Sequence, residues 1–197
     1  MSATAWIVLA LVAVVVIWAI AVYNRLVQLR NRIANAFGQI DVQLKRRYDL
    51  VPNLVEVARG YLAHEAVTLE AVIKARGQAQ GAAAAARAAP TSASAMGALA
   101  VAEQALGGSL GRLMMVAESY PELKADATMQ SLSEELTSTE NRLGFARQAY
   151  NDQVLDFNDQ AAQFPAIVVA RLLGFPTAPM LESTRSDEER AAPKVQF

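Results

Sequence analysis

Residues 3–48 read ATAWIVLALVAVVVIWAIAVYNRLVQLRNRIANAFGQIDVQLKRRY, and this stretch decides the fold. From Ala3 to Val22 it is an uncharged apolar run. Roughly 20 residues at about 1.5 Å per residue reach across a hydrocarbon core about 30 Å thick. No Pro or Gly separates Val22 from the polar residues that follow, and apolar residues then recur every three or four positions as far as Tyr48. We therefore expect one helix that leaves the membrane and continues into a bundle, whose other helices cover its apolar stripe. The stripe consists of Leu26, Leu29, Ile33, Phe37, Ile40, Leu44 and Tyr48.

The residues around the apolar run predict its orientation. Trp6 and Trp18 are spaced to lie near opposite ends of the span, as interfacial anchors do, although both would also serve as apolar filler. Arg25, Arg30 and Arg32 follow the run, whereas no charged side chain precedes it. The positive-inside rule therefore predicts a single-pass protein of the bacterial inner (cytoplasmic) membrane, with its amino terminus outside and its helical domain in the cytoplasm.

Composition narrows the class of protein. The 197 residues contain no cysteine, so neither disulfides nor zinc thiolate sites are expected, and we predict no metal and no cofactor. A formal net charge of −1 argues against nucleic acid as a partner. A cleaved signal peptide is an alternative to the anchor, because residues 19–21 form a small-x-small site, but the basic region that should precede the apolar run is missing.

Turn signals divide the rest of the chain into further helices. Asp49 and Pro52 are typical of a helix start, so we place the first reversal at residues 49–53, with a kinked continuation past Pro52 as the alternative. The second helix then carries apolar residues as far as Ile73. The low-complexity, alanine-rich segment from Gly77 to Pro90 can be helical without being firmly packed, and we place the second connection there, ending near Pro90.

Two more helices complete the predicted architecture. One starts at Thr91 or Ser92 and stops at Tyr120, and the next starts at Asp126. The last helix has the most regular apolar seam. An all-α fold follows, with an N-terminal transmembrane helix that continues into an up-down antiparallel four-helix bundle; a two-stranded coiled-coil hairpin within an oligomer is the alternative. The seam comprises Leu132, Leu136, Thr139, Leu143, Ala146, Tyr150, Val154, Phe157, Ala161 and Phe164.

An up-down topology returns the end of the fourth helix to the membrane surface. The segment 164–175 is apolar on all sides but too short to span a bilayer, so the bundle, a second subunit or the lipid interface must cover it. Its interaction candidates are Ile167, Val168 and Leu172, and we favour contact with a second subunit. We thus predict three regions: an anchor at 1–23, a cytoplasmic bundle at 24–175 and a mobile tail at 176–197.

Catalytic patterns are scarce. His64 and Glu65 begin a zinc-protease motif, but Thr68 stands where the second histidine is required. No residue pattern points to a catalytic, cofactor-binding or metal site, so we predict that the protein is not an enzyme. An envelope-associated hydrolase without a recognisable motif is the alternative function, and a signalling bundle is a weaker one.

Long strings of the chain resemble the LemA family. They include residues 23–27, residues 35–55 with QIDVQLKRRYDL, residues 117–124, 139–142 and 146–152, and Phe164-Pro165. The resemblance covers nearly the whole chain and implies an amino-terminal anchor with an all-helical cytoplasmic domain. Some relatives are linked to magnetosome membranes, and no biochemical activity is implied. The alanine-rich segment 77–90 is longer and blander than is typical of the family.

Charged residues near the predicted turns are further interaction candidates. Lys45, Arg46, Arg47 and Asp49 lie near the first reversal, where they would form ion pairs with acidic residues at 118–126 or offer a docking surface. The sequence therefore predicts a membrane-anchored, non-enzymatic scaffold. It would contact membrane lipid, self-associate as a homo-oligomer through its helical domain, and organise envelope proteins or membrane shape.

Overall fold

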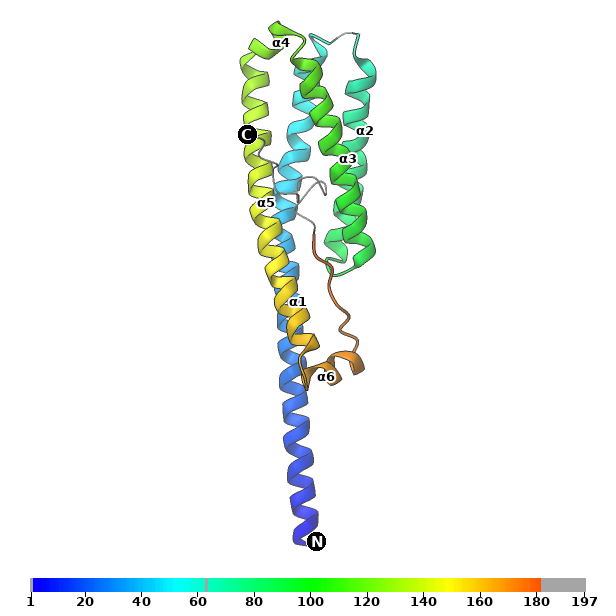
Figure 1. Cartoon of the computed structure of the whole chain (residues 1–197), viewed down its shortest axis with the longest axis vertical. Helices are drawn as coiled ribbons and strands as arrows, with labels where there is room; N and C mark the ends of the chain where they lie inside the picture. Colours follow the sequence, from blue (N-terminus) through cyan, green and yellow to red (C-terminus); the bar gives the residue numbers. More distant parts are fainter. Residues whose placement is uncertain (1, 63, 182–197) are drawn as a thin grey trace, which may run out of the picture.

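The computed structural model describes residues 2–62 and 64–181 and consists of long helices arranged around α1. Helix α1 (Ala3–Arg59) extends 57 residues without a break. α2 (Ala66–Ala88), α3 (Ala93–Ala117) and α5 (Ala127–Ala162) form the bundle with it, and two short helices, α4 (Pro121–Ala125) and α6 (Ala166–Leu172), flank α5. The four long helices run up, down, up and down, with the first third of α1 projecting alone below the bundle (Figure 1). This confirms the predicted all-α antiparallel bundle.

The core follows from the apolar stripe of α1. All seven residues of the predicted stripe, from Leu26 to Tyr48, are buried. α1 packs along α5 on one side and along α2 on the other, while α3 packs mainly on α2. On α5, the seam is buried at Leu143, Tyr150 and Phe157, as the heptad pattern predicts.

The first reversal lies further along the chain than we predicted. α1 continues through Pro52 to Arg59, and the chain reverses before α2 begins at Ala66. The apolar pattern explains the continuation, because Val51, Leu54 and Ala58 are fully buried and extend the same stripe. The prediction of a helix start at 49–53 is therefore wrong, and the alternative of continuation past Pro52 is correct.

Pro52 is tolerated inside α1 because another residue replaces its hydrogen bond. A proline lacks the N–H that would donate to the carbonyl four residues earlier. That carbonyl belongs to Tyr48, and it accepts a 2.6 Å hydrogen bond from the Arg76 Nε of α2. The polar group that Pro52 leaves without its helical partner is thus satisfied by a neighbouring helix.

The alanine-rich segment is helix rather than connection. α2 extends to Ala88, and Ala79, Ala83 and Ala86 are buried against the rest of the bundle. Alanine is the strongest helix former and its small side chain lets helices approach closely, so low complexity here marks tight packing. The connection to α3 is only residues 89–92, and the predicted linker from Gly77 to Pro90 is wrong.

The helix starts were predicted more accurately. Ser92 caps α3, where its Oγ accepts a hydrogen bond from the Ala95 N–H at 3.4 Å. Asp126 caps α5, where its Oδ1 accepts from the N–H groups of Thr128 and Met129, both at 2.9 Å. Both capping residues stand where the sequence placed the third and fourth helices.

The chain beyond α6 packs back onto α5 instead of leaving the bundle. Phe175, Ala178 and Leu181 are buried. The amide of Asn158 exchanges hydrogen bonds with the backbone of Ala178, at 2.9 and 2.8 Å. Residues 176–181 are therefore a packed strap, which corrects the prediction of a mobile tail from 176; residues 182–197 lie outside the described part of the chain.

Candidate functional site

The projecting part of α1 has the properties of a membrane anchor. Its best 18-residue window has a mean hydropathy of 3.0 and none of that window is buried within the protein. Trp6 and Trp18 both lie within the apolar run 3–22, where Trp6 is 60% exposed and Trp18 is half-buried. Arg25, just beyond the apolar run, is exposed and donates to the Gln28 side chain at 3.2 Å. Within the described residues, α1 is the one helix long and apolar enough to cross a membrane.

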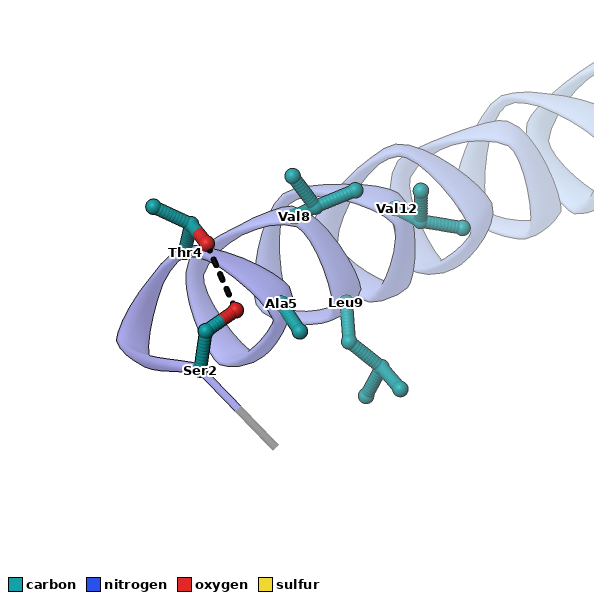
Figure 2. Close-up of a pocket in the computed structure, with 6 residues that line it drawn as sticks. All are labelled: Ser2, Thr4, Ala5, Val8, Leu9 and Val12. Atoms are coloured by element: carbon teal, nitrogen blue, oxygen red, sulfur yellow. Dashed lines mark hydrogen bonds between the residues drawn. The ribbon is translucent and has the colours of Figure 1, made fainter.

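The start of α1 is a plain apolar helix surface. Figure 2 shows Ala5, Val8 and Leu9 along it, after the hydroxyls of Ser2 and Thr4, which form a 2.7 Å hydrogen bond with each other. A shallow depression lies over these residues. Because one exposed helix forms all of it, no opposing wall encloses a ligand. This surface is suited to lipid rather than to a bound small molecule.

A buried ion-pair cluster lies in the middle of the bundle. Arg47 of α1 is 5% exposed, and its Nη1 lies 2.9 Å from a carboxylate oxygen of Glu103 on α3 and 2.9 Å from one of Glu140 on α5. The other oxygen of Glu103 accepts a 2.5 Å hydrogen bond from the Tyr48 hydroxyl. The cluster therefore ties three helices together at one level.

Tyr48, Arg47 and Glu103 are shielded from solvent. Burial raises the pKa of the Tyr48 hydroxyl well above its ordinary value, and the adjacent Glu103 carboxylate raises it further. Gly107 of α3 lies against Arg47, since a Cβ added there would be in ordinary contact with the Arg47 Nη2 at 3.6 Å. A cavity of about 220 Å³ adjoins the cluster, and three of the charged residues that line it, Arg47, Glu103 and Glu140, pair with one another. This arrangement is suited to fixing the register of the helices.

The predicted ion-pair cap at the turns is therefore wrong for Arg47. The first reversal lies about three turns later than predicted, so the basic cluster lies partway down the bundle and pairs with α3 and α5 instead of with residues 118–126. Arg46 forms an exposed 3.1 Å pair with Glu135. Lys45 and Asp49 are exposed and remain candidates for contacts with other molecules.

The first reversal, between α1 and α2, forms a polar contact of its own at the membrane-distal end of the bundle. The Tyr61 hydroxyl donates to Asp126 Oδ2 at 3.1 Å, which joins the first reversal to the start of α5. Hydrogen bonds from the Met129 N–H and from Tyr61 lower the pKa of Asp126. His64 is exposed near this turn, and the described residues contain no group of His, Asp or Glu side chains that could hold a metal ion.

The candidates near the end of α5 lie at the base of the bundle. Helix α6 packs Ala166, Val169 and Ala170 against α1 and α5. Val168 is 49% exposed and Leu172 is 78% exposed, while Ile167 is half-buried. Phe164, which the seam included, is 85% exposed, so the seam ends at Ala161. Figure 1 places α6 beside α1 just above the projecting segment.

Sequence reasoning missed the partners that fix these elements. No role was predicted for Arg76, Glu103 or Glu140, because the partner of each is distant in sequence. The strap was missed too, although Asn151 and Asn158 are seven residues apart and so lie on one face of α5. That spacing was a usable signal: both amides bind strap backbone, Asn151 at Leu181 with 2.7 and 2.8 Å hydrogen bonds.

Comparisons with known proteins place these features in a family. A family model described as the LemA family matches residues 36–197. The chain is also similar to the magnetosome proteins MamQ 1 and MamQ 2 of Paramagnetospirillum magneticum (strain ATCC 700264 / AMB-1), each 31% identical over 77 residues. That alignment covers 39% of this chain and 28% of each magnetosome protein.

Proposed function

Because this chain belongs to the LemA family and joins an apolar segment to its bundle through one unbroken helix, we propose that it is a membrane-anchored, non-enzymatic scaffold. The observation that carries the proposal is the continuity of α1. Beyond Val22, α1 extends for roughly 55 Å at 1.5 Å per residue, packed against α2, α5 and α6. The bundle is therefore a column fixed directly to its anchor, a form suited to holding partners at a set height above a membrane.

The proposed scaffold lies in the bacterial inner membrane, with its amino terminus outside and its bundle in the cytoplasm. Arg25, Arg30 and Arg32, which follow the apolar segment, support this orientation. The similarity to two magnetosome proteins fits a role at a membrane. Within this proposal, the bundle organises envelope proteins or membrane shape, and exposed Lys45, Arg46 and Asp49 offer polar contacts for such partners.

A cysteine scan tests the orientation, because the chain contains no native cysteine. Val67 is 79% exposed at the start of α2, far from the projecting segment (Figure 1). Val67→Cys should resist a membrane-impermeant maleimide in intact cells and react once the cells are permeabilised. Labelling of intact cells would place the bundle outside.

Self-association needs a surface that the chain leaves open, and the outer face of α3 is the best candidate. Val101 is 68% exposed and Met115 is 71% exposed, and their spacing of 14 residues places them on one face. Between them, on the same face, a Cβ added at Gly108 would meet no atom within 4 Å. A helix of a second copy could therefore approach this face closely.

The mass of the assembly tests this part of the proposal. Light scattering of the full chain in detergent should give a discrete multiple of the 21.2 kDa chain. The double variant Val101→Glu, Met115→Glu should reduce that mass to one chain without lowering the melting temperature, because both positions are exposed. Val67→Glu is the matched control and should leave the mass unchanged. A wild-type monomer at every concentration would contradict self-association.

A further inference from the structure

Helix α6 is two-sided, although every residue in it except Arg171 is apolar. Ala166, Val169 and Ala170 face the bundle and are buried. Val168 and Leu172 are four residues apart, so they share the opposite face, and both are exposed. The described part of the chain therefore covers only one side of α6 and leaves an apolar ridge on the other.

The position of α6 along α1 determines which medium surrounds that ridge. The chain leaves α6 through Phe175, whose ring lies 5.5 Å from the ring of Tyr23 in an edge-on contact. The Arg30 guanidinium covers the same ring, also at 5.5 Å from its centre. Tyr23 follows Val22, the last residue of the apolar segment, so α6 is held where the predicted span ends. In Figure 1, α1 continues alone directly below this level.

We propose that α6 lies in the interfacial layer of the membrane, with Val168 and Leu172 inserted toward the acyl chains as a second membrane contact. The Tyr23–Phe175 contact holds this ridge at the level where the exposed apolar segment of α1 ends, and this level favours lipid over protein as the surrounding medium. Exposed Arg171 lies beside the ridge and can reach headgroup phosphates while its stem stays among apolar groups. The partner is a lipid surface that contains anionic headgroups.

This second contact has a structural consequence. One spanning helix leaves a bundle free to rotate and tilt about the membrane normal. A bundle that also rests on α6 is oriented, because α6 packs on both α1 and α5. The inference rests on the proposed anchoring by residues 3–22 but not on self-association.

Site-directed fluorescence tests the inference on the full chain, which has no native cysteine. Leu172→Cys, labelled with an environment-sensitive dye, is reconstituted into vesicles of phosphatidylethanolamine and phosphatidylglycerol. We expect a blue-shifted emission that brominated lipid quenches and aqueous iodide does not. Val67→Cys, at the membrane-distal end, is the matched control and should be quenched by iodide alone. Both substitutions are at exposed positions, so folding is preserved.

The remaining outcomes separate the alternatives. Val12→Cys, in the projecting segment, reports whether the anchor is inserted: lipid quenching at residue 12 with iodide quenching at residue 172 would overturn the α6 contact while leaving the anchor intact. Lack of lipid quenching at residue 12 would overturn both. Shielding of residue 172 from both quenchers, relieved when labelled chains are diluted in excess lipid, would show a second copy on α6 and would also overturn the lipid contact.

Discussion

Replacing Arg76 with methionine tests how α1 continues through a proline. Arg76→Met keeps most of the apolar stem but removes the Nε that donates to the Tyr48 carbonyl at 2.6 Å. Pro52 has no backbone N–H, so it cannot donate a hydrogen bond to that carbonyl. A buried carbonyl left without a partner costs about 1–3 kcal/mol. A loss of about 2 kcal/mol lowers the melting temperature of a domain of this size by roughly 4–8 °C.

A double-mutant cycle isolates this contact. Pro52→Ala restores an N–H that can donate to the Tyr48 carbonyl, and should itself stabilise α1 because proline is unfavourable inside a helix. In that background Arg76→Met should cost less than about 0.5 kcal/mol, giving a coupling of about 1–2 kcal/mol. Melting of the full chain in detergent, followed by circular dichroism, measures both values. Arg59→Met is the control, because Arg59 is exposed and should change little. An equal cost for Arg76→Met in both backgrounds would show that Arg76 does not compensate for the N–H that Pro52 lacks.

The same melting assay checks three further predictions. Glu103→Ala should lower the free energy of unfolding by about 3 kcal/mol, because it leaves the buried Arg47 with one partner fewer. Glu56→Ala, in an exposed pair, should lower it by less than about 0.5 kcal/mol. Equal costs would show that the cluster is solvated. Leu143→Asp, fully buried, should abolish cooperative melting, whereas exposed Phe145→Asp should not; unchanged melting of the first would disprove the heptad phase. Burial raises the pKa of Tyr150 from 10.0 to about 12, so the folded state holds that proton more tightly and stability is full below about pH 10 and falls toward pH 12. Tyr150→Phe should flatten part of that alkaline loss, and an unchanged slope would contradict it.

The parts of the fold that were predictable depend on local signals. The recurrence of apolar residues every three or four positions was enough to predict the stripe from Leu26 to Tyr48. The preference of Ser and Asp for the N-cap position predicted the starts of α3 and α5 at Ser92 and Asp126. These signals are complete within a few residues of sequence. Pro52 is typical of a helix start, but here a residue 24 positions later satisfies the carbonyl that it leaves without a donor, so the helix continues. No local pattern shows that Arg76 will supply the missing donor.

The candidate site was less predictable because its geometry is long-range. The basic residue Arg47 stood out, but its partners Glu103 and Glu140 lie on other helices, and shifting the first reversal changed which residues face it. The two sides of α6 could not be told apart either, since both are apolar in sequence. Only packing on α1 and α5 distinguishes the buried Val169 from the exposed Leu172.

A distance along α1 tests most directly whether one rigid helix carries the bundle on its anchor. Spin labels at Ile20→Cys and Asn53→Cys, both exposed, lie on either side of the membrane exit and of Pro52. For the full chain in lipid nanodiscs, diluted with unlabelled protein, we expect a narrow distribution centred at about 50 Å, from 1.5 Å per residue along an unbroken helix. A broad distribution, or a mean well below that distance, would show a hinge in α1 and contradict the rigid column.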